Sequence, residues 1–284
     1  MGVLLQRRRY MGGGVPASEE GYDGGYLTLT ALEDTTFTFT IGSNVGTGDM
    51  TGIYYSLDGG DNWIYTANVA SQKVVITTPL VHKGEYVLWK GVNKRPSIAR
   101  TTVGSSRFSS DGKFAVGGTL ASLIWGDDYD TKFNTKDWNS FNWLFYQSKV
   151  RNAKNLKLTL TSLHNGTYYS LFSNCTNLNV PPMEITVGGD CYQQMFSDCT
   201  SLESSPDILI PTLASNSLKE MFKGCTSLKH IKIMSTNISA SNCLQNWVQN
   251  VGSTGTFEKA EGVTFPSGAS GIPSGWTVVE IPTT

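Results

Sequence analysis

Three segments of the chain share one eight-residue pattern and decide the fold: Leu171-Phe-Ser-Asn-Cys-Thr-Asn-Leu178, Met195-Phe-Ser-Asp-Cys-Thr-Ser-Leu202 and Met221-Phe-Lys-Gly-Cys-Thr-Ser-Leu228. They align without gaps at spacings of 24 and 26 residues. A regular repeat of about 20–29 residues indicates a solenoid, whose units bury their apolar faces by stacking on one another. We therefore predict a continuous core made of Phe172, Cys175, Leu178, Phe196, Cys199, Leu202, Phe222, Cys225 and Leu228.

Each repeat is expected to contain a short helix followed by a strand. Tyr192 and Phe196 are four residues apart, which would place both on the core side of such a helix. The residue before the shared Cys is Asn174, Asp198 or Gly224, and these types tolerate the left-handed backbone with which helices commonly end. The alternating stretches after each Leu should pair as parallel strands about 4.8 Å apart.

The Met-Phe-x-x-Cys-Thr-Ser-Leu repeat resembles the BspA-like leucine-rich repeats of Treponema pallidum and Bacteroides surface proteins, an interaction fold common in gut bacteria and their phages. The resemblance covers residues 143 to about 250 and rests on Phe, Cys, Thr and Leu at fixed offsets. We therefore predict a multidomain fold of the β plus α/β class, in which an N-terminal antiparallel β-sandwich is followed by a short leucine-rich-repeat solenoid.

The rest of the chain divides by composition into further parts. Residues 1–25 combine arginines with many glycines and should form a flexible anchoring arm, disordered in isolation. Residues 26–118 alternate apolar and polar side chains with turn signals between the runs, which predicts the β-sandwich. Residues 119–142 are rich in aromatic side chains and are interpreted as a connector, and residues 143–284 as the solenoid with a C-terminal β cap.

Composition excludes several classes of protein. The net charge is −1, so no overall field would attract nucleic acid or an anionic membrane. No apolar run approaches the roughly 20 residues that a membrane-spanning helix needs, and the first residues do not have the order of a secretory signal. The five cysteines are an odd number and are expected to be free, buried thiols.

Motifs of catalytic or metal chemistry are weak. The segment Ser56-Leu-Asp-Gly-Gly-Asp-Asn-Trp63 resembles the Asp-box of sialidases, where it is a hairpin turn and not a catalytic site. The shared cysteines lack the close pairs of zinc modules, so no metal or cofactor is expected. Asp127, Asp128 and Asp130 could hold Ca²⁺ but are better explained as a solvated turn. Two distant carboxylates of a glycosidase would be invisible in the sequence, so a carbohydrate-active enzyme stays a weaker alternative.

The layout of the whole chain resembles structural proteins of gut Bacteroidetes phages and prophages. The resemblance implies a non-enzymatic protein of the virion surface, a head fibre or capsid decoration, that forms a homo-oligomer and does not bind nucleic acid or insert into a membrane. Its arm would bind other virion proteins of the capsid or tail through Arg7, Arg8, Arg9 and Tyr10, although the arginines could equally be a solvated tail. The solenoid would bind a host-surface or mucosal glycan or protein, and the candidate binding residues are Tyr168, Tyr169, Tyr192 and Trp247. The alternative is a bacterial cell-surface adhesin built from the same repeats.

Overall fold

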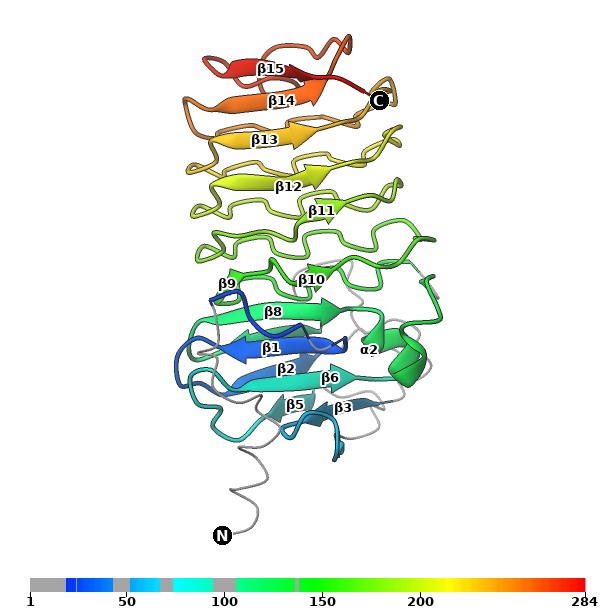
Figure 1. The fold of residues 1–284 in the computed structure, drawn as a ribbon, viewed down its shortest axis with the longest axis vertical. Helices are drawn as coiled ribbons and strands as arrows, with labels where there is room; N and C mark the ends of the chain where they lie inside the picture. Colours follow the sequence, from blue (N-terminus) through cyan, green and yellow to red (C-terminus); the bar gives the residue numbers. More distant parts are fainter. Residues whose placement is uncertain are drawn as a thin grey trace.

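The computed structural model describes residues 19–23, 25–42, 52–66, 74–93, 106–135 and 138–283. These residues form one tall stack, with twisted sheets at the N-terminal end and a column of coils above them (Figure 1). Regular structure in the described part is almost entirely β, apart from α2 (Ser122–Trp125) and the 3₁₀ turn η1 (Gly126–Asp128). The expected β-rich multidomain fold is confirmed, whereas its α/β component is wrong.

Two sheets face each other at the N-terminal end of the stack. They pack through aromatic side chains, with ring centroids of Phe37 and Phe114 5.4 Å apart and those of Trp89 and Phe108 5.0 Å apart. The smaller sheet has the order β5 (Val74–Thr77), β2 (Phe37–Ile41), β7 (Arg107–Ser110). The larger sheet has the order β10 (Leu156–Lys157), β8 (Phe114–Thr119), β1 (Leu27–Ala31), β6 (Tyr86–Lys90), β3 (Ile53–Ser56), β4 (Ile64–Thr66), and β9 (Val150–Asn152) also pairs with β8.

The two sheets differ in how their faces are covered. Strand β2 alternates buried and half-buried residues, as the period-two pattern predicts for a strand with one solvated face. Strand β1 is instead buried at all five positions. Its outer face is covered by residues 19–23, because the amide of Tyr22 donates to the Thr30 hydroxyl at 2.9 Å and the Tyr22 ring stacks on Tyr86 at 4.1 Å. The end of the predicted free arm is thus a docked part of the fold.

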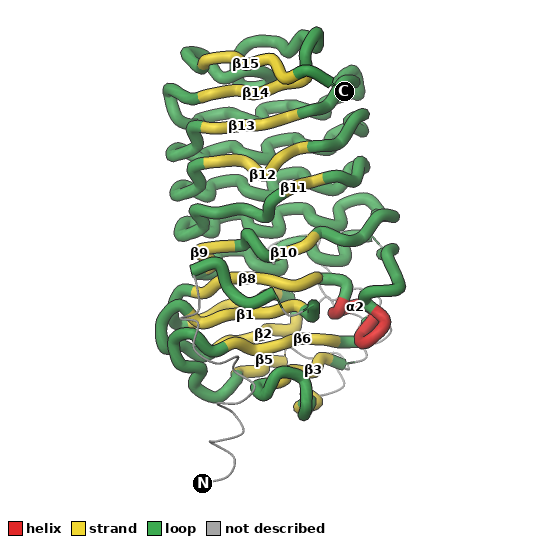
Figure 2. The backbone as a smooth tube through the Cα atoms, viewed as in Figure 1, coloured by secondary structure: helices red, strands yellow, loops and turns green. Residues whose placement is uncertain are grey.

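Above the larger sheet, the chain winds into coils that each carry a strand on one side and a series of turns on the other (Figure 2). The strands form a parallel five-stranded sheet in chain order. Side chains in register, such as Phe257 on Val278, therefore stack in rows up the column. The strands are β11 (Glu184–Ile185), β12 (Ser204–Ile208), β13 (His230–Ile233), β14 (Thr256–Ala260) and β15 (Thr277–Ile281).

The short helix expected in each repeat is absent from the described coils, and successive turns replace it. Within one coil the amide of Leu171 donates to the carbonyl of Tyr168 at 3.2 Å, but the amide of Phe172 donates to Met195 of the next coil at 2.9 Å. Alternate amides thus bond within and between coils, whereas every amide of a helix would bond within its own segment. A positive φ recurs every four residues, as at Ser170 (51°) and Asn174 (60°), and prevents a helix from propagating.

The sandwich and the coils are continuous in both sheet and core. Strand β8 pairs antiparallel with β1 on one edge and parallel with β9 and β10 on the other. The ring of Phe145 lies 5.6 Å from Phe108 of the sandwich and 5.3 Å from Phe172 of the next coil. Phe141, which was assigned to the connector, stacks on Tyr168 at 5.9 Å and belongs to the first coil. The predicted boundary at residue 142 therefore does not coincide with a break in the structure.

Candidate binding surfaces

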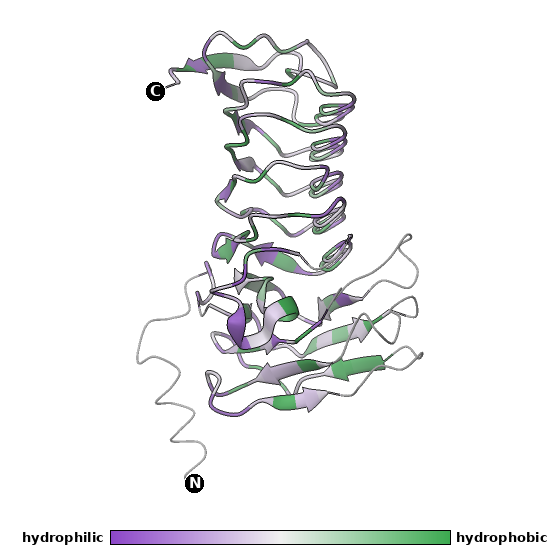
Figure 3. Cartoon of the chain, turned by 90° about the vertical axis from the view of Figure 1, so that its right-hand side faces the viewer, coloured by the Kyte–Doolittle hydropathy of each residue, from purple (hydrophilic) through white to green (hydrophobic). Residues whose placement is uncertain are grey.

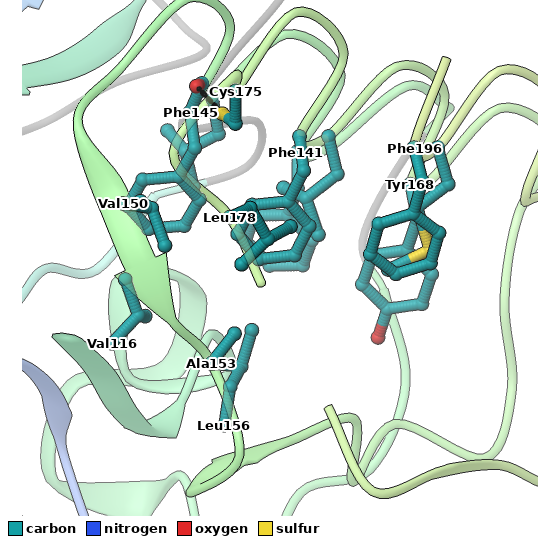
Figure 4. Close-up of a cluster of buried hydrophobic side chains, with 14 of the residues drawn as sticks. Val116, Phe141, Phe145, Val150, Ala153, Leu156, Tyr168, Cys175, Leu178 and Phe196 are labelled. Carbon is teal, nitrogen blue, oxygen red and sulfur yellow. Dashed lines mark hydrogen bonds between the residues drawn. The ribbon is translucent and has the colours of Figure 1, made fainter. Parts of the chain in front are cut away.

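The predicted core residues of the three repeats form one interior column. Phe172, Phe196 and Phe222 stack with centroids 5.7 Å apart and interplanar angles of 5° and 6°. All nine predicted core side chains are fully buried. Figure 4 shows Phe141, Phe145, Tyr168 and Phe196 on the turn side of this interior, opposite Val116, Ala153 and Leu156 on the strand side. The stacking predicted from the repeat is confirmed at these positions.

Three of the four candidate binding residues lie in the same interior and were wrongly assigned. Tyr168 and Tyr192 are 1% exposed and Trp247 is 0% exposed, so none of them reaches a partner at the surface. Burial raises the pKa of both Tyr168 and Tyr192 above the usual range of a phenol. The Tyr192 hydroxyl is satisfied internally, because it donates to the carbonyl of Val187 at 2.9 Å. These rings are structural members of the column.

The shared cysteines are structural as well. Each thiol donates to the backbone carbonyl of a Phe one coil below: Cys175 to Phe145 at 2.8 Å and Cys199 to Phe172 at 3.0 Å. Burial raises the pKa of the Cys175 thiol to about 12, despite hydrogen bonds from Ser148 that lower it. A thiol in this state is a poor nucleophile and a poor metal ligand. In the part of the chain that the structure describes, no three His, Cys, Asp or Glu side chains gather as a metal site.

Tyr169 is the one candidate binding residue that reaches the surface. Its hydroxyl donates to Gln194 Oε1 at 2.9 Å, and Gln194 Nε2 donates to Glu220 Oε2 at 2.6 Å. Its ring packs edge-on against Trp143 at 5.5 Å. The row from Trp143 to Glu220 therefore crosses four successive coils on the turn side, which Figure 3 shows as a column of narrow loops opposite the strands. This row is a half-buried polar strip with aromatic flanks.

The predicted anchoring residues Arg7, Arg8, Arg9 and Tyr10 lie outside the described residues. The segment that follows them, residues 19–23, is held on the first coil by ion pairs. Glu20 contacts Lys154 at 2.6 Å and Asp23 contacts Lys157 at 2.7 Å. Sequence reasoning missed this contact, although the acidic residues of an otherwise Arg- and Gly-rich segment were a usable signal.

The Asp-box-like segment forms the hairpin between β3 and β4, as expected. The Ser56 hydroxyl donates to Asp58 Oδ1 at 2.7 Å and accepts from the amide of Gly60 at 2.9 Å. Asn62 donates to Asp58 through its backbone at 3.0 Å and its side chain at 2.7 Å. Burial raises the pKa of Asp58, but these hydrogen bonds prevail and the pKa is lowered. The carboxylate therefore closes a turn.

The carboxylates of Asp127 and Asp128 are hydrogen-bonded to side chains of this chain. Asp127 accepts hydrogen bonds from Lys90 at 2.6 Å and Tyr26 at 2.7 Å, and Asp128 contacts Lys132 at 2.5 Å. The hydrogen bonds from Lys90 and Tyr26 lower the pKa of Asp127. Asp127 and Asp128 are therefore held in ion pairs by lysines of the chain, which fits the interpretation of this segment as a turn.

The strand side of the column carries charged side chains in rows. Asp207, Lys232 and Glu258 occupy equivalent positions on β12, β13 and β14. The Lys232 ammonium lies 2.5 Å from Asp207, and this hydrogen bond raises the pKa of the lysine. His230 contacts Glu258 at 3.1 Å. The face is polar and largely self-paired, and no residue on it was singled out from the sequence.

A groove interrupts this face between β10 and β11. Strand β10 is the last strand of the larger sheet and β11 the first of the parallel sheet, and no pairing joins the two. The groove has a volume of about 530 Å³, within the range of roughly 300–1,000 Å³ typical of ligand sites. Its walls include Lys157 and Leu158 on one side, Met183, Glu184 and Thr186 on the other.

Comparison with protein-family models, with curated proteins and with solved structures found no match to this chain. In the described ranges, no helix has the length and apolar character that crossing a membrane requires.

Proposed function

We propose that this chain is a non-enzymatic protein of a phage virion surface, a head fibre or capsid decoration, that presents a leucine-rich-repeat solenoid of the BspA-like type. The observation that carries the proposal is the single aromatic core running from the sandwich through Phe145 to Trp247. Such a core makes the molecule a rod with polar sides. Its chemistry lies on its surfaces, because the aromatic rings of this core and the thiols of the shared cysteines are buried.

The assignment to leucine-rich repeats is supported by the place of the recurring leucines. Leu178, Leu202 and Leu228 are each fully buried where a coil turns into its strand side. Their coils pair in parallel with the next coil and cannot cover an apolar face without it. This arrangement serves presentation of an extended surface to a glycan or protein.

Anchoring through the N-terminus is supported by the fixed starting point of the described chain. Residues 19–23 are held by ion pairs to the first coil and by stacking on the sandwich. The arginines at positions 7–9 therefore lie within 12 residues of a segment that is docked on the fold. A short basic segment on a rigid base suits insertion into an acidic groove of a capsid or tail protein.

The location is tested by quantitative mass spectrometry of purified phage particles and of bacterial envelopes from the same producing culture. We expect this chain in particles, at a constant ratio to the major capsid protein. Presence in envelopes with absence from particles would replace the proposal by the bacterial adhesin. Release of reducing sugar from mucosal glycans by the purified chain would favour a carbohydrate-active enzyme.

The anchor is tested separately by deleting residues 1–18, which leaves the docked residues 19–23 in place. We expect the truncated chain to be absent from assembled particles, while the thermal unfolding of the purified truncated chain is unchanged. A matched variant, with Arg7, Arg8 and Arg9 all replaced by Ala, distinguishes charge from length. Incorporation equal to that of the full chain in both variants would contradict the anchor. Light scattering of the purified chain tests the expected homo-oligomer.

A further inference from the structure

The groove between β10 and β11 is a built-in interruption of the sheet. Val180 forms a bridge to Asn152 at one end of the coil, so the two coils begin in register. Pro181 and Pro182 follow directly, and proline has no amide hydrogen to donate to a ladder. Beyond them, among the strands that the structure describes, β11 pairs with β12 alone. The coils meet again on the turn side, where the amide of Gly166 donates to Asp190 at 2.6 Å.

Both walls of the groove present backbone groups of extended chain. The carbonyls of Met183 and Ile185 accept from β12 at 2.9 and 2.8 Å, so those of Glu184 and Thr186 point away from β12 toward the groove. On the other wall, Asn155 bonds to β8 through its carbonyl at 3.1 Å, which turns the backbone of Leu158 toward the groove. Across the described residues, no backbone hydrogen bond links 156–159 with 183–187. Two strand edges therefore face each other without a strand between them.

The charges of the two walls are unequal. On the β10 wall, Lys154 and Lys157 are neutralised by Glu20 and Asp23 of the docked segment. On the β11 wall, Glu184 is exposed and has no ion pair with any residue that the structure describes. The side chain at the equivalent position of β12 is Asp207, which Lys232 already neutralises. Met183, 66% exposed, adds an apolar rim beside Glu184.

We propose that this groove binds an extended peptide of a partner protein, which adds a strand between β10 and β11 and places a Lys or Arg side chain opposite Glu184. Main-chain hydrogen bonds to Leu158, Glu184 and Thr186 provide the affinity for the peptide. The negative charge of Glu184 provides the selectivity for a basic side chain. A residue opposite Glu184 in the completed sheet presents its side chain on the same face, within reach of the carboxylate. This proposed site goes beyond the proposed function and does not depend on where the protein is located.

In the experiment, a yeast-displayed library of random linear heptapeptides is selected for binding to the purified full chain. Three forms of the chain are used as separate targets. They are the wild type, Glu184→Lys and, as a matched control, Glu261→Lys, which changes an exposed Glu at the far end of the column. We expect the wild type and Glu261→Lys to enrich peptides with a central Lys or Arg about tenfold or more. Glu184→Lys should enrich Asp or Glu at that position instead. No enrichment, or the same enriched set with Glu184→Lys as with the wild type, would overturn the proposal.

Strand addition is tested with the best wild-type peptide. We expect binding to slow hydrogen exchange at the amides of Leu158, Glu184 and Thr186, and the milder variant Glu184→Gln to weaken it roughly three- to fivefold, as for an exposed ion pair. Methylation of the backbone nitrogens at alternate residues should weaken binding in both possible frames, because a strand between two walls turns one set of amides toward Leu158 and the other set toward Glu184 and Thr186. Undiminished binding of a peptide methylated in either frame would show that no strand is added between the two walls.

Discussion

The two halves of the molecule bury similar aromatic side chains in opposite ways. In the sandwich, Trp89 and Phe108 meet at 72° and Phe37 and Phe114 at 79°, because two sheets approach face to face from different directions. In the coils, Phe172, Phe196 and Phe222 lie within about 6° of parallel, because each is the same residue of the same turn one repeat later. In the sandwich, each ring therefore has its own packing environment. In the coils, the same packing arrangement of the ring recurs in each repeat.

The difference has a consequence for cooperativity. A residue of the sandwich is supported from several strands that are distant in sequence, as β1 is by β6, β8 and the docked segment. A residue of a coil is supported only by the coils above and below it. A destabilising substitution in the coils should therefore promote local unfolding of the neighbouring coils along the column. A destabilising substitution in the sandwich should lower the stability of the sandwich as one unit.

The largest effect is expected from Phe196→Ala, in the middle of the column. Removal of a fully buried ring between two stacked rings should cost about 3–5 kcal/mol. Urea unfolding followed by hydrogen exchange should show β13, β14 and β15 opening before the sandwich. The matched sandwich variant, Phe39→Ala, should unfold its half in one step. A single unfolding transition shared by the coils and the sandwich of Phe196→Ala would contradict the expected difference in cooperativity.

Next in size is the effect of Asn174→Val, at a position with φ of 60°. A β-branched side chain in this conformation should destabilise the protein by about 1–2 kcal/mol, whereas Asn174→Gly should be close to neutral. Thermal unfolding of the pair separates backbone strain from the loss of the side chain. Equal loss in both variants would show that contacts of the Asn174 side chain matter more than its backbone.

A smaller effect is expected from Tyr169→Phe. The variant keeps the ring against Trp143 and removes the hydrogen bond to Gln194, so it should cost about 1 kcal/mol. A double-mutant cycle with Gln194→Ala, read by urea unfolding, isolates the bond. A coupling energy near zero would mean that the polar strip adds nothing to the stacking of the coils.

The smallest effect is expected from Asp127→Asn, in the turn η1, whose carboxylate contacts Lys90 and Tyr26 of the sandwich. The pKa of Asp127 is lowered by Lys90 and Tyr26, so the folded state favours the carboxylate and the stabilisation is present above the unfolded pKa of about 3.9. Because 67% of this side chain is exposed, the loss at pH 7 should be only roughly 0.2–1 kcal/mol. The difference from the wild type should disappear as the pH falls below the folded pKa. A difference that persists at pH 2 would exclude the ion pair as its cause.

Several features could be predicted from particular residues. The recurrence of Phe172, Phe196 and Phe222 correctly indicated a common interior, and Asn174, Asp198 and Gly224 indicated a positive φ, observed at 60°, 60° and 76°. The expected helix failed because the left-handed conformation recurs every four residues, also at Ser170 and Gln194, where the residue type gives no sign of it.

The candidate binding residues failed for a related reason. Large aromatic side chains suit both a core and a binding surface, and their spacing says nothing about which side of a turn faces inward. Tyr168 and Tyr169 are adjacent in the chain, yet one is buried and the other reaches the polar strip. Only the path of the backbone separates them.

The amino-acid sequence alone determined that like segments stack and which side chains repeat along the stack, because a fixed period places equivalent residues in equivalent surroundings. Tertiary structure decided how the stack begins and where it is interrupted. The docking of residues 19–23 and the continuation of β8 into β9 and β10 depend on contacts between segments far apart in the chain. The groove has a local signal in Pro181 and Pro182, but its two walls come from different coils. No local pattern encodes such contacts, because each partner is an ordinary residue until the fold brings the other beside it.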